Sequence, residues 1–256
     1  MDTHPRMEQP IKPFGTAAPG TAAAGIAPLG IALPGAPPPI TPIRSRVAPP
    51  YPQRGTGLLQ SFVHAWNGLI HTVVYQRNMR IHLICAILVG LVGSGIPLGL
   101  AEKVTLIFCV LLIFFAEILN TALEQLVDLT IQEFDEKARI VKDAAAAGVF
   151  VLALGTVAIF AAILAYNWET VTSHAGDVGR QFLVGIPLAA CAALLIMDWK
   201  RPKPAASDIL LFACATLLFT ASAIRSTSYV FSSMTYALVI VSGAAAWQRR
   251  RAARPA

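Results

Sequence analysis

The stretch Glu117-Ile-Leu-Asn120-Thr-Ala-Leu-Glu124-Gln-Leu-Val-Asp128 decides the fold, because it places three carboxylates and an amide inside an apolar segment long enough to cross a bilayer. On a helix these polar positions fall at about 0°, 300°, 340° and 20°, so they form one narrow stripe. An acid at the membrane centre costs roughly 2.5–3.5 kcal/mol and normally faces a bundle interior or a water-filled cavity. The stripe therefore predicts an active or transport site, although Asp128 taken alone also fits the level of the lipid head groups.

The composition excludes a soluble protein. Hydrophobic residues make up 55% of the chain and charged residues only 13%, and the mean hydropathy is +0.62. A soluble domain could not bury that much apolar surface. The net charge of +6 comes from basic residues at the ends of apolar segments, which indicates membrane topology and argues against a nucleic-acid partner.

The chain divides into three parts. Residues 1–57 contain 13 of the 18 prolines, with many Gly and Ala residues, which favours a disordered tail. The second part, residues 58–166, contains an amphipathic surface helix at 58–75 and three predicted spans at 81–100, 104–127 and 141–166. The third part, residues 167–256, contains a polar loop at 167–179 and apolar runs near 181–198, 208–224 and 229–247. We therefore predict an all-α integral membrane protein with a three-span bundle followed by three further helices. A re-entrant pair is the alternative for the two shorter runs, 181–198 and 208–224.

The basic residues predict the orientation. One side of the predicted membrane holds Arg77, Arg80, Lys137, Arg139, Lys142, Lys200, Arg201, Lys203 and Arg249–Arg251, and the other holds only Lys103, Arg180 and Arg225. The positive-inside rule then predicts that both termini are cytoplasmic. The Asp128 end of the stripe and the pair Lys142–Asp143 would face the cytoplasm, where ATP is available.

Polar groups that meet at this face point to phosphoryl transfer. That chemistry needs cations on the phosphates, carboxylates for Mg²⁺ and a base for the acceptor hydroxyl. Glu124 and Lys142 can supply the metal ligand and the cation. Glu117 lies about 10 Å deeper, which suits a lipid alcohol whose hydroxyl sits at the membrane surface. The sequence contains neither GxxxxGK[ST] nor the glycine-rich loop of protein kinases.

Three motifs carry a family resemblance: Arg77-Asn-Met-Arg-Ile-His82, then Glu117 to Glu124 with Val127-Asp128, then Val141-Lys142-Asp143-Ala-Ala-Ala. Together they resemble the prokaryotic diacylglycerol kinase family, in particular its undecaprenol kinase branch, over about residues 58–166. The resemblance implies a multi-pass homotrimer of the bacterial inner (plasma) membrane. It also implies phosphorylation of a lipid alcohol, undecaprenol or diacylglycerol, with ATP and Mg²⁺ at sites between subunits.

The resemblance also assigns residue roles. Glu117 matches the catalytic base and Asn120 its neighbour in the site. The positions that match nucleotide-contacting or metal-binding residues are Gln76, Glu124, Glu133, Lys142 and Asp143, with Glu124 and Gln76 on the metal side. Gln76 departs from the family, which usually has a glutamate there. An amide oxygen can bind Mg²⁺ but brings no charge.

Two other classes of function remain open at this stage. A catalytically impaired membrane scaffold follows if Gln76 abolishes metal binding. An ion- or proton-coupled transporter would use the acidic stripe as its path, but it leaves Lys142 and Asp143 unexplained. The resemblance does not extend to residues 167–256, for which we expect a packing or partner-binding role.

Overall fold

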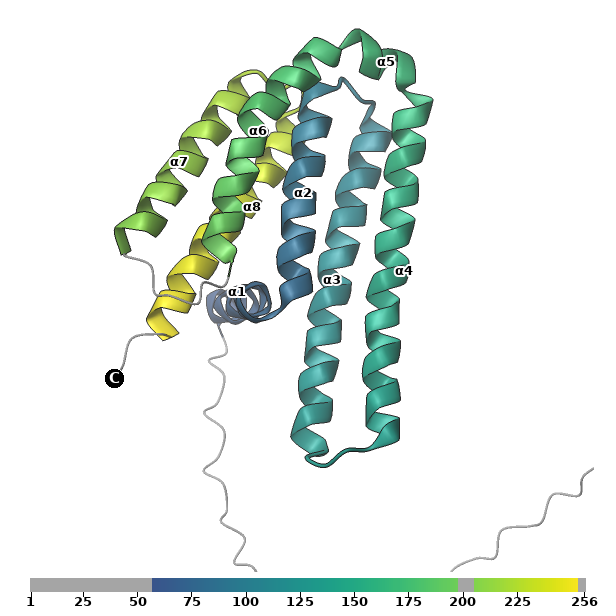
Figure 1. Cartoon of the computed structure of the whole chain (residues 1–256), viewed down its shortest axis with the longest axis vertical. Helices are drawn as coiled ribbons and strands as arrows, with labels where there is room; N and C mark the ends of the chain where they lie inside the picture. Colours follow the sequence, from purple (N-terminus) through teal and green to yellow (C-terminus); the bar gives the residue numbers. More distant parts are fainter. Residues whose placement is uncertain (1–56, 198–204, 253–256) are drawn as a thin grey trace, which may run out of the picture. The chain divides into compact units, whose positions relative to one another are not determined.

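The computed structural model describes residues 57–197 and 205–252, which form eight helices and no strand. The helices are α1 (Leu58–Tyr75), α2 (Arg77–Gly95), α3 (Leu100–Thr130), α4 (Glu136–Tyr166), α5 (Trp168–Ser173), α6 (Ala175–Ile196), α7 (Ala205–Ile224) and α8 (Tyr229–Ala252) (Figure 1). Six of them, all except α1 and α5, are long and apolar enough to cross a membrane. The predicted all-α membrane fold is therefore confirmed. The predicted tail up to residue 56 and the basic segment 200–203 lie outside the described residues.

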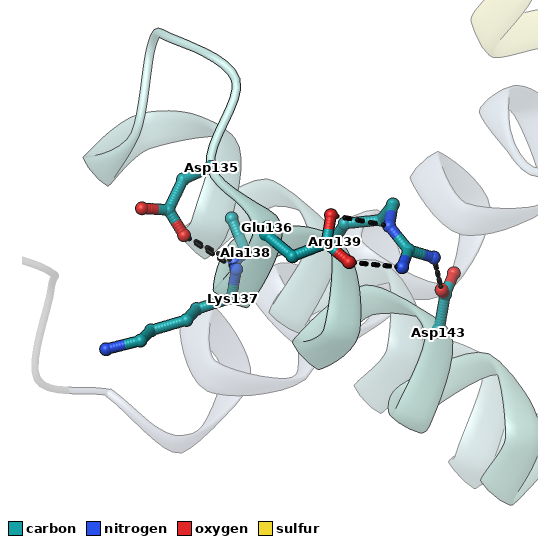
Figure 2. Close-up of polar contacts among 6 residues, drawn as sticks. All are labelled: Asp135, Glu136, Lys137, Ala138, Arg139 and Asp143. Atoms are coloured by element: carbon teal, nitrogen blue, oxygen red, sulfur yellow. Dashed lines mark hydrogen bonds and ion pairs between the residues drawn. The ribbon is translucent and has the colours of Figure 1, made fainter.

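Local chemistry explains where the helices begin and end. Helix α1 has the predicted bounds, whereas α2 begins earlier than predicted, at Arg77, and ends at Gly95. It ends there because Pro97 disfavours a helical backbone at Ile96, the residue before it. Helix α4 begins at Glu136 because the Asp135 carboxylate caps its first turn (Figure 2). That carboxylate accepts hydrogen bonds from the backbone N–H groups of residues 137 and 138, at 2.7 and 3.1 Å.

The third part of the chain is more helical than predicted. The prediction of a polar loop at 167–179 is wrong, because α5 occupies residues 168–173 and α6 begins at Ala175. Helices α6 and α7 contain 22 and 20 residues, which corresponds to lengths of about 33 and 30 Å. Both match the hydrocarbon core of a bilayer, about 30 Å thick, so six spans fit the structure better than a re-entrant pair.

Helix α2 lies among the other helices and joins the second part of the chain to the third. It contacts α1, α3, α6 and α8, while α3 and α4 run side by side (Figure 1). Glycines allow close approach: a Cβ atom on Gly93 would lie 2.5 Å from the Phe231 ring, and one on Gly185 would lie 2.6 Å from Leu91. Small residues at such crossings let membrane helices pack closely. Helices α6 and α8 therefore complete the packing of α2.

Long-range hydrogen bonds define the two ends of this bundle. At one end, Arg80 of α2 and Arg249 of α8 both donate to the carbonyl of Ile196, at 3.3 and 3.1 Å, where α6 ends. At the other end, the backbone N–H and the hydroxyl of Thr227 donate to the carbonyl of Ser94, at 2.8 and 2.9 Å. The starts and ends of these helices thus alternate between two ends, as the distribution of basic residues predicts.

The outer faces of the bundle are apolar. Helix α4 has a single buried residue, Val149, among its 31 residues. Helix α1 lies across the direction of α2 and α3 (Figure 1), and its first half exposes Leu58, Phe62 and Trp66. Exposed apolar side chains on long helices fit contact with lipid tails, and those on α1 fit a helix in the membrane interface.

Candidate active site

The polar stripe of α3 faces the inside of the bundle. Glu117 and Asn120 are 1% and 6% exposed, although they lie within a long apolar helix. The hydroxyl of the buried Thr121 donates to the backbone carbonyl of Glu117 at 2.8 Å. By contrast, Asp128 is exposed near the end of α3. The prediction of an inward-facing stripe therefore holds for its deeper half, and Asp128 lies in the position expected for a residue near the head groups.

Three of the predicted residues form one hydrogen-bonded group, which we call the Gln76–Asn120–Glu124 cluster. The side-chain amide of Asn120 donates to Oε1 of Glu124 at 2.9 Å, and the amide of Gln76 donates to Oε2 at 3.2 Å. Gln76 reaches α3 because it stands at the break between α1 and α2, where its own backbone is extended. Glu117 lies on the same helix, about 10 Å farther along the axis than Glu124.

One atom of the cluster has an unmet hydrogen-bonding requirement. Oδ1 of Asn120 is buried and has no hydrogen-bond partner among the described residues. Burying an acceptor without a partner costs about 1–3 kcal/mol, so a native protein normally supplies one. This carbonyl oxygen therefore indicates a position for a bound group beside Glu124.

The cluster fits Mg²⁺, the metal that the family resemblance implies. Carboxylate and amide oxygens are ligands that this cation prefers, and Glu124 and Gln76 carry one group of each kind. In the structure the amide nitrogen of Gln76 faces Glu124, at 3.2 Å, so this side chain would present its oxygen to a cation only after its amide turned over. The described residues contain no group of three or more His, Cys, Asp or Glu side chains that could hold a metal. Mg²⁺ is usually bound by one or two carboxylates together with substrate phosphates and water.

A second polar group lies where α3 ends and α4 begins. Lys142 pairs with Asp128 across the turn between the two helices. Arg139 donates to Asp143 at 2.7 Å and, through Nε, to Glu136 at 3.1 Å (Figure 2). These ion pairs are exposed, and exposed pairs contribute little to stability. Their effect is to hold cationic and anionic side chains in place at one end of the bundle.

The structure joins some predicted site residues and separates others. Gln76, Asn120 and Glu124 are in contact, with Glu117 deeper on the same helix. No hydrogen bond or ion pair in the described part of the chain links them to Lys142 or Asp143. Glu133 is exposed in the turn before α4 and, within residues 57–197 and 205–252, makes no polar contact.

Arg139 is the residue that the sequence analysis missed at this site. It holds Asp143, which was predicted to contact the nucleotide. The spacing of four residues between an arginine and an aspartate on one helix is a recognised signal for such a pair. That signal was present in the sequence.

Comparison with known proteins identifies the first half of the described chain. The family model for prokaryotic diacylglycerol kinase matches residues 63–164, from α1 to the end of α4. Diacylglycerol kinase from Synechocystis sp. is 36% identical over 132 residues, which are 51% of this chain and 71% of that relative. Undecaprenol kinase from Bacillus subtilis is 36% identical over 95 residues, which are 37% of this chain and 77% of that relative.

The family match covers only part of the chain. No solved structure matches the chain significantly. The family match ends at residue 164, so α5, α6, α7 and α8 lie beyond it. Within the match, Glu117, Asn120 and Glu124 lie on α3, and Lys142 and Asp143 lie on α4. Gln76 stands at the break between α1 and α2. The chain belongs to the prokaryotic diacylglycerol kinase family, a family of membrane lipid kinases.

Proposed function

We propose that this protein transfers the γ-phosphoryl group of ATP to the hydroxyl of a membrane lipid alcohol, diacylglycerol or undecaprenol, at the cytoplasmic face of the bacterial inner membrane. The observation that carries the proposal is the placement of a buried carboxylate, Glu117, on the same helix as the Gln76–Asn120–Glu124 cluster. The named relatives act on these two classes of lipid.

Glu117 is the proposed general base. Its carboxylate takes the proton of the lipid hydroxyl while the hydroxyl oxygen forms a bond to the γ-phosphorus and the bond to the leaving ADP breaks. Its depth suits this role because a lipid alcohol carries its hydroxyl at the boundary between hydrocarbon and head groups. Burial of the side chain, with 1% exposed, keeps competing water away from the acceptor position.

The phosphates of ATP require positive charge and fixed donors. Mg²⁺ bound beside Glu124 and Gln76 would neutralise charge that develops on the phosphoryl oxygens. Asn120 holds the Glu124 carboxylate through one oxygen, and Gln76 holds it through the other, so its orientation is set from both sides. Lys142 and Asp143, with Glu133 in the preceding turn, are the further proposed nucleotide contacts.

A homotrimer is proposed for the active assembly. Among the described residues of one chain, those at the start of α4 make no polar contact with the Gln76–Asn120–Glu124 cluster. A site between two copies would unite them, and the largely exposed faces of α3 and α4 leave room for a neighbouring copy. Chemical crosslinking in membranes should then give a trimer band.

The decisive experiment is a lipid kinase assay on Glu117→Gln. Purified full-length protein in mixed micelles is given radiolabelled ATP with diacylglycerol or undecaprenol, and phosphorylated lipid is counted. The amide keeps the shape but cannot accept the proton, so we expect turnover to fall by about 10²–10⁴-fold. Glu102→Gln, at the start of α3, is the matched control and should retain activity. Near-normal turnover in Glu117→Gln would remove this residue from the role of base.

A further inference from the structure

A cavity lies outside the family match, between α6, α7 and α8. Its volume is about 310 Å³, and its apolar lining includes Leu195, Ile209, Phe212 and Trp247. Ligand pockets typically hold roughly 300–1,000 Å³, so this one can take a head group and the first part of a hydrocarbon chain. None of the residues proposed above for the kinase reaction lines this cavity.

The cavity lies at the same end of the bundle as the start of α2. Leu195, which lines it, immediately precedes Ile196, the residue whose carbonyl accepts hydrogen bonds from Arg80 and Arg249. Trp247 is five residues, between one and two helical turns, before the end of α8. Tryptophan is typical of the membrane interface, where one side of the ring meets hydrocarbon and the other meets water.

A nearly buried ion pair forms the polar part of the cavity. Nε of Arg250 donates to Oδ2 of Asp208 at 2.6 Å, and the two side chains are 22% and 13% exposed. The other carboxylate oxygen, Oδ1, is buried and has no hydrogen-bond partner among the described residues. An ionised carboxylate can only accept hydrogen bonds, so this oxygen requires a donor from water or from a bound molecule.

The chemistry of the lining distinguishes between ligands. A phosphate ester carries about −1.5 to −2 charges and offers acceptor oxygens. It cannot supply the donor that Oδ1 of Asp208 lacks, even though Arg250 and Arg251 also line the cavity. A cation would gain little, because Arg250 already neutralises that carboxylate and Arg251 lies over the Trp247 ring, 5.2 Å from its centre. A neutral molecule with one hydroxyl and a long apolar chain satisfies both parts of the cavity.

We propose that this cavity is a second binding site for a lipid alcohol, separate from the site at Glu117. The hydroxyl donates to Oδ1 of Asp208, and the chain lies against Phe212 and Trp247. Such a site would hold an unphosphorylated lipid at the end of the bundle where the kinase residues lie. The inference rests on the cavity and its unmet acceptor, and it does not depend on turnover.

Photolabelling tests the proposal on the full-length protein in detergent micelles. The probe is hexadecanol that carries a diazirine near its hydroxyl, and labelled residues are found by mass spectrometry. The same chain as a phosphate monoester and as a plain alkane provides two control probes. We expect the alcohol to label the α7 and α8 residues that line the cavity, and the two control probes to label them far less.

Two variants make the test specific. Asp208→Asn keeps an oxygen for Arg250 but replaces the free acceptor by an N–H donor, and labelling should fall by at least about tenfold. The larger side chain in Ile209→Trp fills the cavity and should abolish labelling because the probe no longer fits. Asp177→Asn, in the first turn of α6, breaks an exposed pair with Arg180 and should label like the unchanged protein.

Each contrary outcome overturns a stated part of the proposal. Equal labelling by the phosphate monoester would exclude selection for an alcohol. Equal labelling by the alkane would show only contact with an apolar surface. Undiminished labelling in Asp208→Asn, with an unchanged melting temperature, would show that the Asp208 carboxylate does not bind the hydroxyl. None of these results depends on kinase activity, so failure here is distinguishable from failure of the proposed reaction.

Discussion

Replacement of Gln76 by glutamate should tighten Mg²⁺ binding by about 30-fold. In the structure, the amide of Gln76 donates to Oε2 of Glu124 at 3.2 Å. A glutamate would replace this donor by a second carboxylate. Without a cation the two carboxylates repel each other, whereas a bound cation is attracted by both. Two unit charges 4 Å apart in water interact by about 1 kcal/mol. A divalent cation doubles this to about 2 kcal/mol, which corresponds to about 30-fold in affinity. Because Gln76 is half-buried at the break between helices, the interaction is at least as strong as in water, so about 30-fold is the lower end of the expected change.

Two measurements check this prediction, and only one of them needs turnover. The first is the rise in melting temperature with Mg²⁺ in the absence of ATP, and the second is the free Mg²⁺ concentration that gives half-maximal kinase activity. Gln125→Glu is the matched control, because Gln125 neighbours Glu124 in sequence but contacts His71 on the exposed side, at 3.3 Å. Identical titrations for Gln76→Glu and the unchanged protein would show that residue 76 is not beside the metal. An equal shift in the control would show that added negative charge anywhere in this region, and not a ligand at position 76, tightens Mg²⁺ binding.

Three further changes test other parts of the structure. Gly93→Ala would bring a Cβ atom to 2.5 Å from a buried phenylalanine ring of α8 and should cost about 1–3 kcal/mol, whereas Gly155→Ala faces open space and should be neutral or stabilising; equal melting temperatures would refute the close packing of α2 on α8. Lys142→Met should raise the KM for ATP about tenfold or more, while Lys137→Met should not, and initial rates at varied ATP would show it. In a cysteine-free background, a cysteine at position 102 should react with an impermeant reagent from outside intact cells, and one at 137 only after permeabilisation; the reverse pattern would invert the proposed topology.

The sequence predicts the membrane fold well because long apolar runs and a polar stripe are local signals. The stripe places Glu117 and Asn120 on an inward face, and both are buried. The exact ends of the helices are harder to predict, because hydropathy measures the part of a helix that lies in lipid and not the whole helix. Helices α3 and α4 each contain 31 residues, about 46 Å, and so they extend beyond the apolar core.

Contacts between distant segments could not be predicted from local patterns. The contact between Gln76 and Glu124 joins residues 48 apart, and only the family resemblance placed both at one site. The Asp208–Arg250 pair joins residues 42 apart in a region without any resemblance. An aspartate near the start of one apolar run and an arginine at the end of another are ordinary flanking charges when read separately. The cavity that they line forms only when α7 and α8 pack together, and this packing is not evident from either segment alone.

The packing of α2 on α8 has a consequence for biosynthesis. The hydrogen bond from Thr227 to Ser94 spans 133 residues of chain. At a translation rate of about 5–20 residues per second, the partner of Ser94 emerges roughly 7–27 s after Ser94 itself. During that interval α2 is in the membrane with its glycine-lined face unfilled by α8. A chain whose synthesis stops before α8 therefore has all the family-matched helices but exposes the face of α2 that α8 covers in the finished protein.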